Sequence, residues 1–382
     1  MPRPLICIDC RYIRERPSGI TPLVQAIVDH APRLAPEYGF YFLKHPNGPA
    51  RLSNAPNVVR EVVVEEEANG PATLWWLPAV VDLRSVALFH ATFNTLPAWL
   101  TMKTVVTMCD VMWLKHPHWA RSPGAWGYLE TLFFQRGIRH ALANATRLGA
   151  ISEATRQEIR TVDAAAYERT RITFLGVSDE FRVLEGEDGA RAIDSAREKW
   201  LPGARRFVLT VGQFAGYKNH ETVVRAFARA FRDDPEVHLG LVQRLGQGQR
   251  ALVPIARQLG VQDRVHFLAG VPFPELIALY NGALCLCHPS LYEGYGNPPS
   301  EALACGCPVV TSNRSSMPEV SGDAALLVDP ESVESVAAAL RRVASEPELA
   351  ARMRTRGLAR AKELSWERFA EQNVEIYREL LG

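Results

Sequence analysis

The chain has 382 residues, of which 47% are hydrophobic and 22% are charged, and its formal net charge at pH 7 is +1. This composition is typical of a folded globular protein, and the near-zero charge excludes a general polyanion binder, so we expect no nucleic-acid partner. The length suggests two domains, and no apolar run approaches the roughly 18 residues of a membrane-spanning helix.

Short apolar runs recur along the chain from its beginning. The first, at residues 5–10, is interrupted early by Asp9 and followed by Arg11, which is typical of a core strand and not of a secretion signal, so we expect a cytoplasmic protein. Further strands are expected at 40–44, 59–64, 86–91, 104–109, 147–152, 171–175, 206–212, 237–242, 265–270, 283–290, 308–312 and 324–329. Runs that are apolar on both faces predict parallel sheets covered by helices.

Amphipathic stretches separate these runs, for example at 21–34, 221–231 and 274–284. Strand-helix alternation repeated in both halves predicts an α/β protein with two Rossmann-like, doubly wound domains, which we expect to face each other across a cleft. The polar segment 177–192 shows no clear periodicity and is expected to hold the boundary. We therefore expect domains at 1–183 and 184–363, and a final helical segment at 364–382.

Six of the seven cysteines form close pairs, which are Cys7 and Cys10, Cys285 and Cys287, and Cys305 and Cys307. Each pair lies in or beside an apolar run, and the paired CxxC spacing of a zinc site is absent. Buried free cysteines in a reducing compartment are therefore favoured over a metal site.

The segment SLYEGYGNPPSEALACGCP, at 290–308, places Glu293 and Glu301 at the two ends of a loop rich in glycine and proline. The two prolines suit the first turn of a helix that ends at Gly306. We expect Glu293 to project from the loop into the cleft and Glu301 to lie in the first helical turn. The loop backbone and the helix N-terminus would suit a phosphate or sugar hydroxyls. Two nearby carboxylates are also consistent with an acid/base pair or a metal site, and Glu301 alone would complement the helix dipole.

Residues 290–330 resemble the donor-site signature of retaining glycosyltransferases of the GT-B fold, family four, in which a glutamate is followed by seven residues and a second glutamate. Other segments resemble the family and follow its usual order; they are IDCRYIRERPSGI, FHATFNTLP, VVTMCDVMWLKHP, GAISEATRQEIR, VGQFAGYKNHETVVRAF and VHFLAGVPFPELIALYNGALCLCHPS. The resemblance covers essentially the whole chain and is strongest in its second half.

The family resemblance implies transfer of a hexose, with retention at the anomeric carbon, from a nucleotide diphosphate sugar to a glycan or lipid-linked saccharide. GDP-mannose is the favoured donor and a UDP-hexose the second choice. The first domain would serve the acceptor, the second the donor, and the final helix would return towards the first domain. The implied catalytic residues are Glu293, Lys218 and Asp110, and the implied donor-binding residues are Glu301, Gly294, Tyr295, Gly296, Asn297, Gln213, Arg244 and Gly19.

The resemblance also implies roles for three of these residues. Glu301 would accept hydrogen bonds from the ribose hydroxyls, Glu293 would lie beside the donor sugar, and Lys218 would neutralise charge on the leaving diphosphate. The chain has no DxD motif, so neither a metal ion nor another cofactor is expected. A lysine at the start of a helix opposes the helix dipole, so we expect an anionic group beside Lys218.

Three positions depart from the family pattern. Gln213 stands where many members have arginine, which leaves phosphate neutralisation to Lys218, helped by Arg244. Cys109-Asp110 replaces a His-Asp pair, so Asp110 either orients the acceptor, serves as its base, or is simply satisfied by nearby backbone groups. The loop at Gly19 lacks the family's second glycine and is equally consistent with an ordinary turn.

The acceptor side is less informative. His90, His116 and His118 each fit a structural role better than a catalytic one. The stretch 126–147 mixes aromatic residues with arginines, which fits either a helix packed within the first domain or contact with an anionic membrane surface. A position at the inner face of the membrane is therefore an alternative to a free cytoplasmic one.

Two other function classes are consistent with these residues. A glycoside hydrolase would use Glu293 and Glu301 as its carboxylate pair. A catalytically weak nucleotide-sugar binding protein would explain Gln213 and Cys109. The sequence carries no indication of an oligomeric state.

Overall fold

The computed structural model describes residues 3–15, 19–122, 124–243 and 247–382, and these form two compact units. The first unit comprises residues 1–176 and 365–382, and the second comprises residues 177–364. The boundaries expected from the sequence, 183/184 and 363/364, differ from these divisions by seven residues and one residue. The expected cleft between the two domains stays a prediction.

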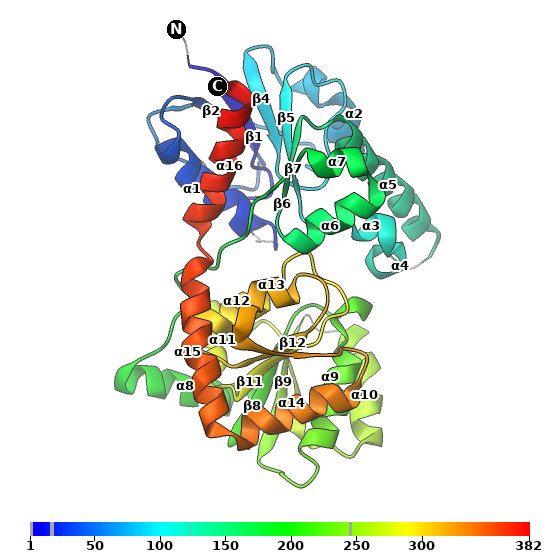
Figure 1. The fold of residues 1–382 in the computed structure, drawn as a ribbon, viewed down its shortest axis with the longest axis vertical. Helices are drawn as coiled ribbons and strands as arrows, with labels where there is room; N and C mark the ends of the chain where they lie inside the picture. Colours follow the sequence, from blue (N-terminus) through cyan, green and yellow to red (C-terminus); the bar gives the residue numbers. More distant parts are fainter. Residues whose placement is uncertain (1–2, 16–18, 123, 244–246) are drawn as a thin grey trace. The chain divides into compact units, whose positions relative to one another are not determined.

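The first unit is built on a seven-stranded sheet with the order β3-β2-β1-β4-β5-β6-β7 (Figure 1). Its elements are β1 (Leu5–Asp9), α1 (Thr21–Leu34), β2 (Gly39–Lys44), β3 (Val58–Val63), α2 (Pro71–Val80), β4 (Val86–Ala91), β5 (Lys103–Met108), α3 (Met112–Lys115), α4 (Pro117–Ala120), α5 (Ala125–Asn144), β6 (Arg147–Ala150), α6 (Glu153–Val162), α7 (Ala164–Glu168), β7 (Thr170–Ile172) and α16 (Trp366–Leu381).

The second unit is built on a six-stranded sheet with the order β10-β9-β8-β11-β12-β13. Its elements are α8 (Gly186–Trp200), β8 (Arg206–Val211), η1 (Gly216–Lys218), α9 (His220–Ala230), β9 (Val237–Val242), α10 (Gln247–Gln258), η2 (Gln262–Arg264), β10 (Val265–Leu268), α11 (Phe273–Gly282), β11 (Cys285–His288), α12 (Asn297–Ala304), β12 (Val309–Ser312), α13 (Met317–Ser321), η3 (Gly322–Ala324), β13 (Ala325–Val328), α14 (Val333–Ser345) and α15 (Pro347–Glu363).

Every paired strand in both sheets is parallel, as the doubly apolar runs predict. In the second sheet, the chain adds β9 and β10 on one side of β8, and β11, β12 and β13 on the other. The order therefore reverses between β8 and β11, and ligands of open parallel sheets bind at the carboxyl ends of the strands at such a point. In the first sheet the equivalent reversal lies between β1 and β4.

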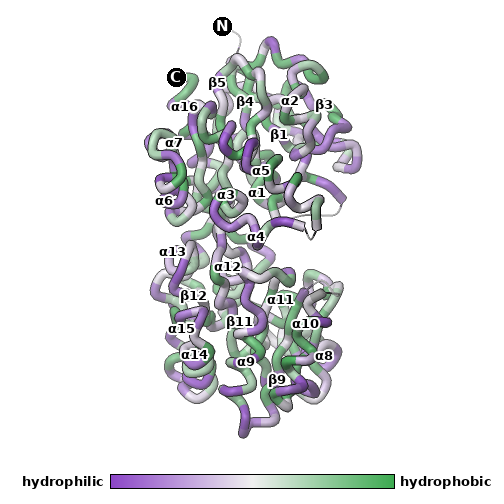
Figure 2. Tube along the Cα trace, turned by 90° about the vertical axis from the view of Figure 1, so that its right-hand side faces the viewer, coloured by the Kyte–Doolittle hydropathy of each residue, from purple (hydrophilic) through white to green (hydrophobic). Residues whose placement is uncertain are grey.

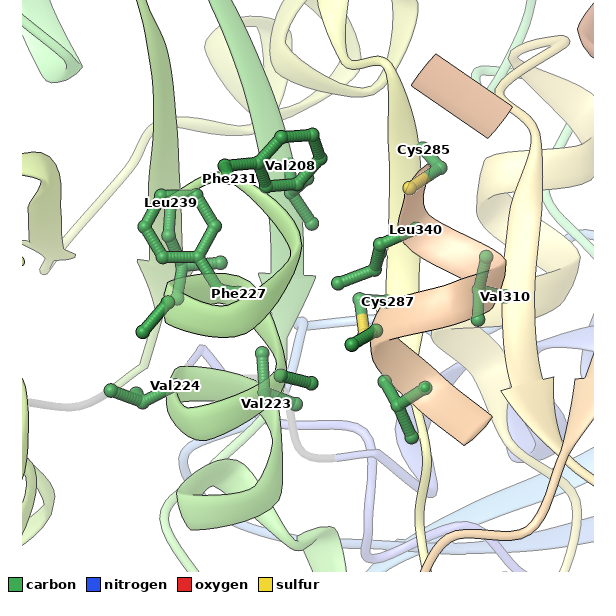
Figure 3. Packing of buried hydrophobic residues seen from close by; sticks show 14 of the residues in the cluster. Val208, Val223, Val224, Phe227, Phe231, Leu239, Cys285, Cys287, Val310 and Leu340 are labelled. Carbon is green, nitrogen blue, oxygen red and sulfur yellow. The ribbon is translucent and has the colours of Figure 1, made fainter. Parts of the chain in front are cut away.

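Apolar side chains from both faces hold the second sheet. On one face, Phe227 of α9, Phe231 directly after this helix and Leu340 of α14 pack against strand residues such as Val208 and Leu239 (Figure 3). Fully burying each such side chain stabilises the fold by about 1.5–3 kcal/mol. Helices α8, α11 and α12 cover the opposite face of the sheet. Helices α14 and α15 alternate hydrophilic and hydrophobic residues along the chain, as surface helices do (Figure 2).

The segment 177–192 was expected to hold the domain boundary, and the second unit begins at its first residue. The segment shows no clear periodicity in sequence, but α8 begins within it at Gly186. Only Gly189 and Ala196 of this helix are buried, so its apolar face is too small to give a clear period.

Candidate active site

Two loops meet at the switch point of the second sheet. The loop after β8 leads through η1 to Lys218, and the loop after β11 carries Glu293. The backbone N–H of Leu291 donates to the carbonyl of Tyr217 at 2.7 Å, which ties the two loops together. The topology thus brings together two charged side chains that lie 75 positions apart in the chain.

Glu293 lies at the centre of a buried polar cluster. Its Oε1 accepts hydrogen bonds from Lys218 Nζ at 2.6 Å and Ser290 Oγ at 2.8 Å, and lies 2.9 Å from His288 Nε2. All three of these contacts are made to Oε1, not to Oε2. Glu293 is 8% exposed, so it is a buried and paired carboxylate, and its expected projection into the cleft stays a prediction.

The charges of this cluster are set by its members. Burial alone would raise the pKa of Glu293, but Lys218 and His288 outweigh it and lower the pKa to about 2. Burial lowers the pKa of His288, so its ring is neutral at pH 7 and donates its Nε2 proton to the carboxylate. Glu293 is the anionic group that the dipole argument anticipates beside Lys218.

The backbone after Glu293 is held in place from the following loop. Ser316 Oγ donates to the carbonyls of Glu293 at 3.0 Å and Tyr295 at 2.8 Å, and Ser315 Oγ donates to the carbonyl of Glu293 at 2.5 Å. Gly296 has a φ of +95°, a left-handed conformation that favours glycine, and a Cβ there would lie 2.2 Å from Met317 Cε. The loop is therefore rigid, as backbone recognition of a ligand requires.

Helix α12 begins at Asn297, with both prolines in its first turn, and Gly306 follows it with a φ of +69°, as predicted. Glu301 is the fifth residue of the helix, so the expectation that it lies in the first turn is wrong. Its Oε2 accepts a hydrogen bond from the Tyr280 hydroxyl at 2.8 Å. Burial raises the pKa of Glu301 to about 7, although Tyr280 and Lys218 both act to lower it.

The remaining second-unit predictions have different outcomes. The aliphatic part of Lys218 crosses Gly212, whose added Cβ would lie 3.8 Å from the lysine Cδ and Cε. Gln213 follows directly and is exposed. Arg244, predicted to support Lys218, lies outside the described residues.

Asp110 and Gly19 belong to the first unit. The Asp110 carboxylate accepts a hydrogen bond from Met112 N at 2.9 Å at the end of β5, in keeping with the backbone-satisfied alternative. Gly19 is exposed, with no atom within 4 Å of an added Cβ. His90 is fully buried, with its ring nitrogens 2.6 Å from the Tyr377 hydroxyl and 2.8 Å from Thr107 Oγ1, which is a structural role.

Three residues of the site were not identified from the sequence: His288, Ser290 and Tyr280. His288 ends an apolar strand and Ser290 begins the loop that carries Glu293. Two polar residues within five positions of Glu293 were the sequence feature that could have indicated hydrogen-bond partners for it. Tyr280 lies on the apolar face of α11, where it is indistinguishable in sequence from a core residue.

All seven cysteines are free thiols, and all except Cys109 are buried. Within the described ranges, no three His, Cys, Asp or Glu side chains are grouped so that they could hold a metal ion. No helix of the described chain is long and apolar enough to cross a membrane.

Residues 193–360, most of the second unit, match the family described as glycosyl transferases group 1. Over these residues the chain is similar to that family. It is 27% identical over 251 residues to the O-antigen chain mannosyltransferase B of Escherichia coli, covering 64% of each chain. It is 33% identical over 237 residues to the MMP alpha-(1->4)-mannosyltransferase of Mycolicibacterium hassiacum, covering 61% of this chain and 54% of that relative. These matches thus span less than two thirds of either relative.

The likeness to solved structures extends over both units. Anabaena Alr3699/HepE, solved in complex with UDP-glucose, superposes with a TM-score of 0.71 at 16% identity, covering 99% of this chain and all of that one. The two Rossmann-like units therefore form the GT-B architecture that the sequence resemblance implies.

Proposed function

We propose that this protein is a retaining glycosyltransferase that moves a hexose, with mannose favoured, from a nucleotide diphosphate sugar to a glycan or lipid-linked glycan acceptor. The observation that carries the proposal is the Lys218-Glu293 pair at the switch point, with Glu301 on the adjoining helix. The family match and two relatives named mannosyltransferases support the reaction class and the sugar. The UDP-glucose complex of the Anabaena protein supports a nucleotide-sugar donor.

The geometry supports a division of labour among the site residues. Glu301 would accept hydrogen bonds from the ribose hydroxyls, and Glu293 Oε2 would accept one from the donor sugar. When the bond from the anomeric carbon to the diphosphate breaks, the leaving oxygen takes the electron pair. Lys218, fixed within the cluster, would stabilise that charge without a metal ion.

The acceptor oxygen forms the new bond to the anomeric carbon on the face that the diphosphate leaves. The acceptor proton passes to the departing diphosphate or to Asp110. The hydrolase alternative finds no support among the relatives, and Glu293 is already ion-paired with Lys218.

Turnover with EDTA present tests this proposal. We expect GDP-mannose, or else a UDP-hexose, to be consumed with a panel of glycan and lipid-linked acceptors, and proton NMR to show the donor's anomeric configuration in the first product. An inverted product would contradict the proposed retention. Binding of the donor without turnover on any acceptor would instead favour a catalytically weak binding protein.

We further propose that the first unit contacts an anionic membrane to reach a lipid-linked acceptor. Four tryptophans are exposed there, Trp75 by 43%, Trp76 by 61%, Trp99 by 78% and Trp126 by 70%. The Trp99 loop is tied to α2, because Ala98 N donates to the Leu74 carbonyl at 2.8 Å. Tryptophan favours the membrane interface, and residues 98–140 hold five Lys and Arg against two Asp and Glu, which suits anionic lipid.

Replacing both Trp76 and Trp99 by serine is therefore expected to weaken binding to phosphatidylglycerol vesicles by about tenfold, which corresponds to about 1.4 kcal/mol. Co-sedimentation measures the binding, which should also fall with added salt. Val59→Ser with Val63→Ser, at exposed apolar positions of β3, is the matched control and should bind normally. If the wild type does not bind at low salt, this part of the proposal is wrong.

A further inference from the structure

Tyr280 and Glu301 form a buried pair next to the site described above. Tyr280, on α11, is fully buried, and its hydroxyl donates to Glu301 Oε2 at 2.8 Å. Burial and the adjacent carboxylate raise the pKa of Tyr280 well above its usual value, so the phenol keeps its proton throughout the neutral range. Because an ionised carboxylate can only accept hydrogen bonds, Tyr280 is a fixed donor to one of its two oxygens.

The phenol ring is itself held from the segment that opens the second unit. Phe181 packs edge-on against Tyr280, with ring centroids 6.0 Å apart. The neighbouring Asn281 accepts a hydrogen bond from Leu184 N at 2.9 Å and donates to the Arg182 carbonyl at 3.0 Å. The carboxyl-terminal turn of α11, which carries Tyr280, is therefore anchored to residues 181–184.

We propose that Tyr280 is a positioning residue, whose hydroxyl holds the Glu301 carboxylate in the orientation and the charge state that bind the ribose of the donor. The inference rests on the proposed function. It assigns Tyr280 no contact with the donor; the residue acts through Glu301.

The groups that face Glu301 determine its charge state. Tyr280 faces it from α11, Lys218 acts on it from η1, and Cys305 follows at the end of α12. Burial favours the neutral carboxyl, whereas Tyr280 and Lys218 favour the carboxylate, which leaves the pKa at about 7. Because ribose hydroxyls are bound best by the carboxylate, nucleotide affinity should rise with pH through the neutral range and then level off.

Tyr280→Phe removes the hydroxyl and keeps the ring, so the variant tests the hydrogen bond alone. With this donor gone, the pKa of Glu301 rises further, and the midpoint of the affinity-pH curve moves to higher pH. We expect nucleoside diphosphate affinity about tenfold weaker at pH 7, with a clearly smaller deficit above pH 9, where Glu301 is ionised and only its orientation is affected. Calorimetric titration with GDP and UDP from pH 6 to 9.5 measures the curve.

Two other variants distinguish positioning from general structural damage. Tyr377→Phe loses a comparable buried hydrogen bond, to His90 in the first unit, and should leave the affinity-pH curve unchanged. Glu301→Gln cannot ionise and should bind weakly with no pH dependence in this range. Tyr280→Phe that keeps the wild-type midpoint, or that loses affinity equally at every pH, would overturn the inference. Absence of nucleotide binding by the wild type itself would overturn the proposed function first, so the two failures are distinguishable.

Discussion

Replacing Lys218 by methionine is expected to lower kcat by about 10²- to 10³-fold, the effect of removing one preorganised group that stabilises transition-state charge. The variant keeps the length of the side chain but loses the ammonium 2.6 Å from Glu293 Oε1. Because Gln213 is neutral, no charged residue directly before the lysine loop replaces it. Steady-state kinetics with the consumed donor measures the loss.

The same substitution should also destabilise the second unit. Glu293 would stay buried without its cation, and removing one partner of a buried pair costs about 3 kcal/mol. The pKa of Glu293 is lowered in the folded protein, so this stabilisation is complete above the ordinary glutamate pKa and is lost as the pH falls towards about 2. Wild type and Lys218→Met should therefore differ in thermal stability at pH 7 and converge in acid.

Lys44→Met is the control for both effects. Lys44 forms a similar half-buried pair with Glu61 in the first unit, where both side chains are 12% exposed. It should lose stability but keep its turnover. Wild-type turnover in Lys218→Met would contradict the role that we assign to the lysine.

Replacing Glu301 by alanine should weaken nucleoside diphosphate binding by about 10- to 100-fold. Hydrogen bonds to a charged group contribute about 1.5–3 kcal/mol, and the ribose offers two hydroxyls to this carboxylate. Free nucleotide and nucleotide sugar should lose affinity equally, because Glu301 is proposed to contact the ribose and not the hexose. Calorimetric titration measures both.

Glu275→Ala serves as the control for this variant. Glu275 lies on α11 in the same unit and is also hydrogen-bonded, but to Lys199 at 2.7 Å, which is outside the proposed site. It should bind nucleotide as the wild type does. Unchanged affinity in Glu301→Ala would rule out the ribose contact.

The fold followed from the sequence because its dominant patterns are local. Runs such as 237–242 are apolar on both faces and are bounded by turn residues, which specifies a buried parallel strand without knowledge of its neighbours. The limits of α12 were likewise predictable, since two prolines and Gly306 act through the backbone of adjacent residues. The start of α8 was not predicted from the segment 177–192, because this helix buries only Gly189 and Ala196.

The site was less predictable because its contacts are long-range. That Glu293 is paired with Lys218 depends on β8 lying beside β11, which strand order decides and local sequence does not. Glu301 lies beyond the first helical turn because the helix begins at Asn297, directly after Gly296, which adopts a left-handed conformation. Tyr280 could not be recognised from the sequence of α11, because it lies on the apolar face of this helix, where a positioning residue has the same pattern as a core residue.

The central claim is that the second unit binds a nucleotide diphosphate sugar without a metal ion. Calorimetric titration of the wild-type protein with GDP, UDP, ADP and their hexose conjugates, all in EDTA, tests it most directly. We predict that one of the nucleotides, with GDP favoured, and its hexose conjugate each bind in the presence of EDTA. Equal and negligible binding of all three nucleotides would contradict this claim, and would favour a structural role for Glu293 and Glu301.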